Sequence, residues 1–299
     1  TLQTVIEAGK DIVDISGLPE DPLLLDSLAR VRGVRAGVDA GVAPGCSNLI
    51  AGRIGAEWQR VDRFLCYVGG LPVVRTWPWE YKAPFSPADV VEEYTRPARY
   101  VTHGVVVSVP AMAETELIEF PAIGTLEAFI TDGLRTLLRT MKAPFMQEKT
   151  MRFPGHVEKM RILREAGFFS TDPIMVEGAT VRPRDLTARL LFPAWELKEG
   201  DEDFTVMRVL AEGLRDGRPV RLQVDLLDRY DPVTGTTSMA RTTGYTCTAL
   251  VRVLARGAWQ EQGVAPPELL GREPSCYALV MDELARRGIV FHEQLEELD

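Results

Sequence analysis

The opening residues alternate between the hydrophobic spacing of helices and that of strands. Apolar residues within 2–8 fall on one face of a helix, and Gly9 follows as its stop. Residues 11–16 (DIVDIS) are typical of a buried strand, and a second helix at 26–30 and a second strand at 35–39 follow a turn rich in proline and aspartate. This order within about 40 residues predicts parallel strands in a doubly wound α/β sheet, whose ligands gather at the carboxyl ends of the strands.

After residue 60 the pattern changes to β-branched and aromatic runs broken by proline and glycine, which predict antiparallel strands with long connections. Strands are expected at 64–68, 73–84, 105–109, 117–120 and 220–228, and helices at 88–93, 125–138, 156–166, 243–256 and 275–287. The expected fold class is therefore α/β plus α+β. It comprises a partial Rossmann (doubly wound) domain at 1–55, an inserted domain with a mixed or antiparallel sheet at 56–238, and C-terminal helices at 239–299 that return to the first domain.

Composition and charge exclude several classes of protein. The 299 residues carry 34 Lys and Arg against 43 Asp and Glu, a net charge of -9, without a basic block, so a nucleic-acid binder is excluded. No apolar run approaches the roughly 18 residues that a membrane-spanning helix needs. The four cysteines lie far apart without a CxxC pair and the three histidines are isolated. This predicts no disulfide framework, no metal site and a reducing, cytoplasmic setting.

The segment 39–48 is the strongest local candidate for a ligand site. Its glycines and proline follow a predicted strand, so the backbone could approach a ligand closely, and the next helix would point free N–H groups at it. The alternative is an ordinary strand-to-helix turn in which Ser47 or Asn48 caps the helix. Asp39 could accept a hydrogen bond from a substrate amine, or it could serve only to form the turn.

His156 and Arg152 are candidates for proton transfer and for binding a carboxylate. His156 follows a Phe-Pro-Gly turn and opens a predicted helix, where it could carry a proton near neutral pH; an inert helix residue is the alternative. Arg152 stands four residues earlier in a strand-like segment. It would suit an α-carboxylate through a two-pronged contact, and a surface ion pair is its alternative.

For other charged residues, a substrate contact and a local ion pair are both consistent with the sequence. Pro97 is expected to take Thr95 and Arg96 out of a helix and to expose both at a domain seam. There Arg96 would bind a carboxylate, or it would brace Glu92 or Glu93.

Asp132 and Arg135 are three residues apart on one face of the helix predicted at 125–138. An intrahelical ion pair is the default interpretation, and a catalytic acid is the alternative. Near the C-terminus, residues 241–245 (RTTGY) are expected just before a helix, with a threonine as its N-cap and Gly244 permitting a close approach.

Nine segments together resemble the saccharopine dehydrogenase superfamily, most closely its short L-lysine 6-dehydrogenase-like branch. They run in family order through nearly the whole chain, which makes the likeness more specific than any one motif. The segments are 11–16 (DIVDIS), 39–49 (DAGVAPGCSNL), 67–72 (YVGGLP), 92–99 (EEYTRPAR), 127–137 (EAFITDGLRTL), 150–159 (TMRFPGHVEK), 163–169 (LREAGFF), 240–246 (ARTTGYT) and 263–271 (GVAPPELLG).

The resemblance implies a Rossmann domain that holds NAD or NADP and an inserted domain that binds substrate and forms a homodimer. It implies an oxidoreductase that passes hydride between a nicotinamide and the CH–NH2 or CH–NH carbon of an amino acid or amine, by analogy with lysine 6-dehydrogenase the ε-amino carbon of lysine. One alternative is a saccharopine or carboxynorspermidine dehydrogenase. Another is a non-catalytic binding or dimerisation protein that has lost its cofactor-binding half.

With the resemblance, the candidate residues receive roles in the implied enzyme. The catalytic residues would be His156, Asp39 and Asp132. The substrate-binding residues would be Arg96, Arg152, Arg241, Tyr94 and Tyr245. The cofactor-binding residues would be Ser16, Gly41, Pro44, Gly45, Asn48, Thr243 and Gly244. No metal is required.

One departure from the family pattern concerns the cofactor. Such chains open with a strand, a GxGxxG turn and a helix that together hold the pyrophosphate. Here Gly33, Gly37, Gly41 and Gly45 are spaced by four and form no such motif, and the first residue is Thr1. We therefore expect a family chain whose first βαβαβ stretch is removed or never present, either a dehydrogenase fragment or a shortened protein.

Overall fold

The computed structural model describes residues 1–17 and 20–298, and it contains a small parallel sheet of three strands. The expected turn before Asp26 includes residues 18–19 and lies partly outside this description. The strands are β1 (Ile12–Val13), β2 (Arg35–Gly37) and β13 (Gly263–Ala265), in the order β1-β2-β13. Every pair is parallel, so the predicted parallel arrangement is confirmed. Beside the sheet are α1 (Leu2–Glu7), the 3-10 helix η1 (Pro22–Leu25) and α2 (Asp26–Arg32).

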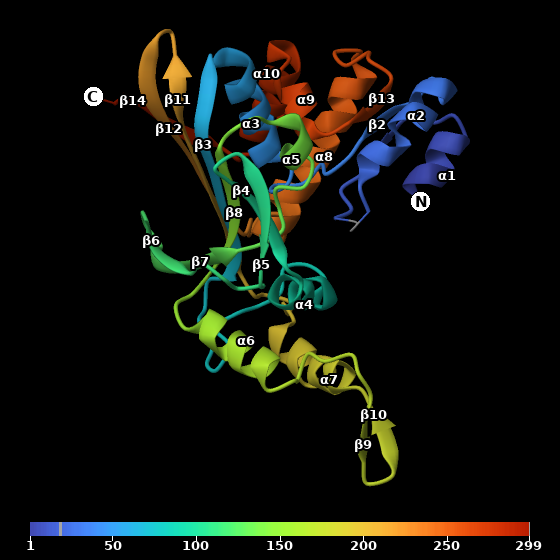
Figure 1. The fold of residues 1–299 in the computed structure, drawn as a ribbon, viewed down its shortest axis with the longest axis vertical. Helices are drawn as coiled ribbons and strands as arrows, with labels where there is room; N and C mark the ends of the chain where they lie inside the picture. The colour runs from blue at the N-terminus through green and yellow to red at the C-terminus, as the bar shows by residue number, and fades with distance from the viewer. Residues whose placement is uncertain (18–19, 299) are drawn as a thin grey trace.

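The second sheet has nine strands and forms the centre of the molecule (Figure 1). Its main path is β14-β12-β11-β3-β8-β4-β5, and β7 joins it by pairing with β8 and with β6. The β3–β8 pair is parallel and the other pairs are antiparallel. The strands are β3 (Arg60–Pro72), β4 (Ala98–Thr102), β5 (Val105–Val109), β6 (Glu116–Phe120), β7 (Gly124–Ile130), β8 (Phe145–Arg152), β11 (Asp203–Arg215), β12 (Arg218–Arg229) and β14 (Phe291–Glu297).

Helices lie between the two sheets and below the large one (Figure 1). The apolar sides of α3, α8 and α10 cover one face of the large sheet and form the main core with it. These helices are α3 (Cys46–Glu57), α8 (Ser238–Ala255), α9 (Pro267–Gly271) and α10 (Pro274–Ala285), and the short α5 (Leu137–Thr140) contacts α9. The lower layer consists of α4 (Pro87–Thr95), α6 (His156–Glu165), α7 (Pro183–Trp195) and the protruding hairpin β9 (Ile174–Val176) and β10 (Ala179–Val181).

Two predicted elements are wrong. Residues 125–138 are not a helix but β7, a loop and the short α5. In β7, Leu126 and residues 128–130 are fully buried, and pairing with β6 and β8 outweighs the helical spacing. The strand expected at 73–84 is absent, because prolines within it supply no N–H to a sheet.

The predicted fold class, with a parallel α/β part and a mixed sheet, is confirmed. Residues 239–299 contribute most of α8 together with β13, α9 and α10 near the small sheet, and they also contribute β14 to an edge of the large sheet. The helix expected at 243–256 begins earlier, at Ser238, because Thr237 caps it through a hydrogen bond from the Ala240 N–H. In the described residues, no helix is long and apolar enough to cross a membrane.

Candidate functional site

The carboxyl end of β2 meets the inserted sheet through a buried ion pair. Asp39 follows β2 with a positive φ of 52° and is 2% exposed. Arg135 Nε donates to both carboxylate oxygens of Asp39, each at 2.9 Å. Arg135 comes from the loop between β7 and α5, so this contact joins the small parallel sheet to the large one. Burial raises the pKa of Asp39, while the Arg135 guanidinium acts in the opposite direction.

Asp132 does not pair with Arg135, so the predicted intrahelical pair is wrong. Asp132 accepts hydrogen bonds from the backbone N–H of Arg99 at 3.0 Å and from its guanidinium at 2.9 Å. The reason is the backbone: Arg135 has a φ of 45°, and the segment between β7 and α5 is a loop. Asp132 therefore fixes this loop to β4 and keeps Arg135 directed at Asp39.

Glu148 is a site residue that the sequence reasoning missed. It lies in the middle of β8, is 5% exposed, and its carboxylate makes no hydrogen bond to any residue of 1–17 or 20–298. The carboxyl group lies directly against the Gly133 Cα, since a Cβ there would be 1.8 Å from Oε1. Alternation gave no signal for it, because residues 147–150 (QEKT) of this buried strand are all polar.

Burial dominates the acidity of Glu148 and raises its pKa to about 8. Further groups act on it from several elements: Glu93, Asp132 and Asp39 raise the pKa and Arg135 lowers it. We call Asp39, Asp132, Arg135 and Glu148 the seam cluster. Three carboxyl groups thus share the environment of Arg135, and the protonation of Glu148 is sensitive to any cation that enters.

Behind the seam cluster, Arg152 is itself buried and lies in a polar group with the partly buried Glu93 rather than in a surface ion pair. Its Nη2 donates to Glu93 Oε2 at 2.6 Å and its Nε to the Tyr94 hydroxyl at 3.2 Å. The guanidinium also lies 4.5 Å from the centre of the Tyr81 ring. Burial raises the pKa of Glu93 and the charge of Arg152 opposes that shift. The sequence-predicted residues Arg152 and Tyr94 are therefore in direct contact.

His156 joins the same group at the start of α6 and is 1% exposed. Its Nδ1 lies 2.9 Å from the carbonyl oxygen of Trp79, which can only accept, so Nδ1 carries the proton. Nε2 lies 2.9 Å from the Tyr94 hydroxyl and accepts its proton. Burial and the charge of Arg152 lower the pKa of His156 to about 3, so the ring is neutral near pH 7.

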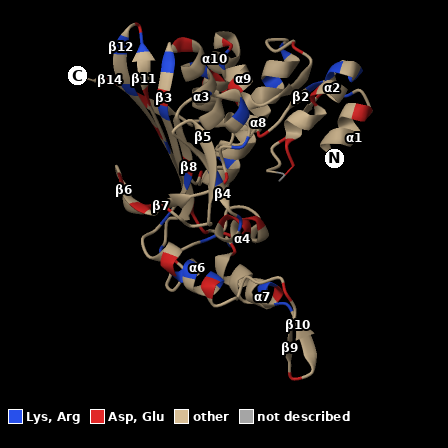
Figure 2. Cartoon of the chain, viewed as in Figure 1, with Lys and Arg blue, Asp and Glu red and all other residues tan. Residues whose placement is uncertain are grey.

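Arg96 is half-buried at the end of α4, the acidic helix seen in Figure 2. Glu92 pairs with Arg184 and Glu93 with Arg152, so the ion pairs of both acids are formed with other arginines. The helix ends at Thr95, two residues later than the expected end at residue 93, because Thr95 remains helical and its hydroxyl donates to the Val91 carbonyl. Only Arg96 leaves the helix as Pro97 requires.

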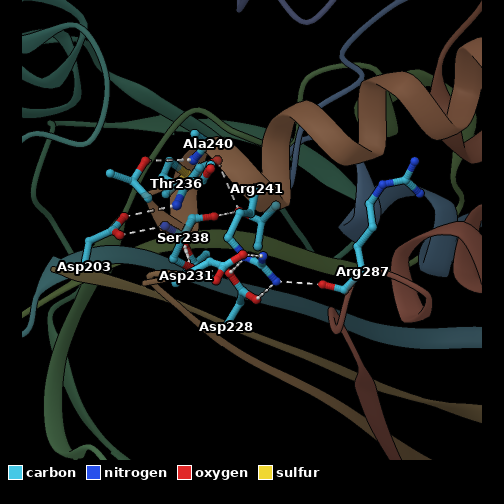
Figure 3. A network of polar contacts seen from close by, with 12 residues as sticks. Asp203, Asp228, Asp231, Thr236, Ser238, Ala240, Arg241 and Arg287 are labelled. Atoms are coloured by element: carbon cyan, nitrogen blue, oxygen red, sulfur yellow. Dashed lines mark hydrogen bonds and ion pairs between the residues drawn. The ribbon is translucent and has the colours of Figure 1, made fainter. Parts of the chain in front are cut away.

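Arg241 lies in a structural network at the start of α8 (Figure 3). Its guanidinium contacts the carboxylates of Asp228 and Asp231 at 3.2 and 3.3 Å and donates to the Arg287 carbonyl at 2.7 Å. Asp203 accepts from the backbone N–H groups of Ser238 and Met239, at 2.6 and 3.1 Å. The network fixes α8 to the ends of β11 and β12, which is the default role of such a buried ion pair.

Residues 241–245 lie inside α8, so the expectation that they precede a helix is wrong. Thr237, and not a threonine of this run, is the N-cap. Tyr245 lies near two guanidinium groups, with its ring centre 5.8 Å from the guanidinium carbon of Arg241 and 5.1 Å from that of Arg287. Tyr245 and Arg241 are thus neighbours at the α8–α10 junction.

The residues predicted to bind the cofactor fall into two groups. Some lie near the carboxyl ends of β1 and β2, and others form hydrogen bonds within the protein. A Cβ on Gly41 would lie 3.0 Å from the Pro44 carbonyl oxygen and 3.7 Å from Thr243, and one on Gly244 would meet open space. Ser16 follows β1 and donates its backbone N–H to Asp14 at 2.7 Å.

The expected turn after β2 is formed by Pro44, Gly45 and Asn48. A cis peptide bond precedes Pro44, and the Asn48 side chain accepts from the Gly45 N–H at 3.3 Å. Asn48 also donates to Glu268 at 2.9 Å. Asn48 therefore caps α3, which is the structural alternative for this segment.

A cavity of about 740 Å³ lies along α7 and the segment 83–87. Its wall is largely apolar, with Phe85 and Phe192, and it reaches Thr237 at the start of α8. None of the sequence-predicted site residues lines it. No group of three His, Cys, Asp or Glu side chains within 1–17 and 20–298 has the arrangement of a metal site.

Comparisons with known proteins place this geometry in a family. The model of the saccharopine dehydrogenase C-terminal domain matches residues 41–289. An alpha-aminoadipic semialdehyde synthase from Arabidopsis thaliana is 25% identical over 187 residues, which cover 57% of this chain and 17% of that protein. The chain thus spans about a sixth of the length of this curated relative.

Two solved structures share the fold. Apo saccharopine dehydrogenase (L-Glu forming) from Saccharomyces cerevisiae has a TM-score of 0.78 at 19% identity, covering 98% of this chain and 81% of that one. Homospermidine synthase from Legionella pneumophila in complex with NAD has a TM-score of 0.64 at 10% identity, covering 98% and 73%. The resemblance to the saccharopine dehydrogenase superfamily is confirmed: the chain belongs to the saccharopine dehydrogenase C-terminal domain family.

Proposed function

We propose that the protein is an NAD- or NADP-dependent oxidoreductase acting on the carbon–nitrogen bond of an amino acid or amine. The observation that carries the proposal is the seam cluster, in which Asp39 at the carboxyl end of β2 meets Arg135 and Glu148 of the inserted sheet. Ligands of open α/β sheets bind at the carboxyl ends of the strands. Buried carboxyl groups at that position suit an amine, whose ammonium group donates three hydrogen bonds.

A nicotinamide cofactor, when bound, supplies the acceptor for the hydride. The carboxyl ends of β1 and β2 fit its nicotinamide end, because Gly244 faces open space and Gly41 lies beside Thr243. Ser16, Gly41, Thr243 and Gly244 would line that end. The sequence has no GxGxxG turn for the pyrophosphate, so no residue of the chain is given that role.

The chain's own residues would bind and orient the substrate. Asp39 would accept a hydrogen bond from the amine while Arg135 holds its carboxylate in place. Arg96 would bind a substrate carboxylate, since neither neighbouring glutamate depends on it for an ion pair. His156, fixed by Trp79, would hold the Tyr94 hydroxyl in position rather than exchange protons directly.

Lysine is the proposed substrate, by resemblance to the lysine 6-dehydrogenase-like branch, and a secondary amine such as saccharopine or carboxynorspermidine is the alternative. A non-catalytic binding or dimerisation protein is the further alternative. That alternative requires that an amine binds without any effect of a nucleotide. The homodimer and the cytoplasmic setting stay predictions of the sequence.

Isothermal titration calorimetry of the full chain tests the proposal. We expect L-lysine or saccharopine to bind, and saturating NAD or NADP to change the affinity for the amine. Lysine with NAD should then also produce the absorbance of reduced nicotinamide. Amine binding that is indifferent to both nucleotides would support the non-catalytic alternative, and absence of amine binding would overturn the proposal.

A further inference from the structure

We propose that Glu148 binds the ammonium group of the amine substrate and takes one proton from it, a role that rests on the function proposed above. No motif or relative assigns this residue. It is neither the aspartate that follows β2 nor one of the arginines expected to bind a carboxylate.

The position of Glu148 supports the role. Its side chain is on the face of β8 that looks toward α3, since its strand neighbour across the β3–β8 pair is Cys66 of the main core. The loop that carries Gly133 packs against the carboxyl group, and the same loop supplies Arg135 to Asp39. Glu148 is therefore held within the seam, where substrate would lie between the two sheets.

Among the described residues, none donates a hydrogen bond to the carboxylate of Glu148. Lys149, its neighbour in sequence, points to the opposite face and donates to the Glu114 carbonyl and to Glu116 at 2.8 and 2.7 Å. The groups that act on Glu148 are Glu93 of α4, Asp132 and Arg135 of the loop, Asp39 after β2 and the Cys66 thiol of β3. Three of these five are carboxyl groups and each pairs with an arginine, so among the described residues Glu148 is the acid of this set that has no ion pair of its own.

An amine fits this environment better than an anion or a neutral group. Buried polar groups are almost always hydrogen-bonded, and an ammonium group would bring Glu148 up to three N–H donors. In the proposed step Glu148 gives up its own proton to solvent as the ammonium group enters; one N–H bond of the ammonium then breaks and one O–H bond forms on Glu148. The nitrogen keeps the electron pair and becomes a neutral amine, the form from which a neighbouring carbon can lose hydride.

The proposal predicts a proton linkage that calorimetry can measure without catalysis. At about pH 7 the free protein holds a proton on Glu148 and free lysine holds one on its ε-nitrogen, and the complex retains only one of the two. Lysine binding should therefore release close to one proton, seen as a dependence of the binding heat on the ionisation enthalpy of the buffer. The release should fall toward zero above about pH 9.

Glu148→Gln keeps the shape of the side chain and removes the proton acceptor. We expect it to weaken lysine binding at least tenfold and to abolish the proton release. Glu119→Gln, which removes the same charge from an exposed position on β6, should change neither. Norleucine, which lacks the ε-amine, should bind the wild-type protein and Glu148→Gln with the same affinity. Thermal unfolding of each variant checks that the fold is kept.

The outcomes separate the two proposals. If the wild-type chain binds lysine, and Glu148→Gln binds it equally well with the same proton release, the role of Glu148 is overturned and the proposed function stands. If the wild-type chain binds neither lysine nor saccharopine, with or without NAD, the proposed function itself fails and the role of Glu148 falls with it.

Discussion

At the scale of single residues, burial decides which groups of the site carry charge. It raises the pKa of Glu148 and lowers that of His156, because the interior disfavours the charged form of an acid and of a base alike. Arg152 and Arg135 then supply the fixed positive charges near the seam, each beside a carboxylate. The site therefore combines permanent ion pairs with two groups that are neutral at about pH 7.

His156 should make the fold sensitive to acid. Its pKa falls from 6.5 to about 3 on folding, so the unfolded chain binds a proton between those values and the folded chain does not. Stability is therefore lost as the pH falls from about 6.5 to about 3. We expect His156→Gln to show a shallower loss of unfolding free energy over this range, measured by urea denaturation. The exposed His292→Gln is the control, and equal slopes for both variants would contradict the prediction.

Arg241 should prove structural. Because Arg241 and Asp228 are nearly fully buried, Arg241→Ala leaves a carboxylate without its partner and should lower the free energy of unfolding by about 3 kcal/mol. Arg252→Ala, which removes a half-exposed partner of Glu283 from the same helix, should cost less than about 1 kcal/mol. Urea denaturation measures both. If the two losses are comparable, the network in Figure 3 contributes little to the free energy of unfolding.

At the scale of elements, close packing of α3 on α9 depends on two glycines. A Cβ on Gly52 would lie 2.0 Å from the Glu268 carbonyl oxygen, and one on Gly271 would lie 2.2 Å from the Leu49 carbonyl oxygen. Both contacts are to backbone, which cannot rotate away as a side chain can. The helices therefore sit close enough for Asn48 on α3 to reach Glu268 on α9.

Two alanine substitutions on α3 should have opposite effects. Gly52→Ala forces α9 away and should destabilise the protein by about 1–3 kcal/mol. Gly55→Ala, three residues later, places its Cβ in open space and should stabilise it by about 0.5–1 kcal/mol, because glycine is a poor helix residue. Thermal unfolding of the two variants gives the comparison. A stabilising Gly52→Ala would mean that the helices are less tightly packed.

Helices and strands were predicted correctly from the sequence where a single local signal dominated. The helix at 156–166 was predicted from its turn and its glycine stop, and the parallel strands from the order of elements. The helix at 125–138 failed because β7 is fixed by partners distant in sequence. The same holds for the site: Asp39 and Arg152 were identified locally, whereas Arg135 as the partner of Asp39 and Glu148 in the seam depend on contacts made only in the folded chain.

At the scale of the whole molecule, the protruding β9–β10 hairpin should be dispensable for folding. The hairpin projects from α7, and its Ile174, Met175 and Val176 are exposed. Replacing 174–181 by a short glycine linker should therefore change the free energy of unfolding by less than about 1 kcal/mol. Deleting 291–297 should cost clearly more, since β14 pairs along the edge of β12. Urea denaturation measures both, and a large loss from the first deletion would mean that the hairpin supports the body.

The path of the chain between the sheets has a further consequence. The backbone passes from the small parallel sheet toward the large one between α3 and β3, returns between β12 and α8, and passes again between α10 and β14. A single nick between β12 and α8 would leave each fragment with at least one strand in both sheets, since the C-terminal fragment carries β13 and β14. The cleaved protein should still elute as one particle on size-exclusion chromatography until a denaturant is added.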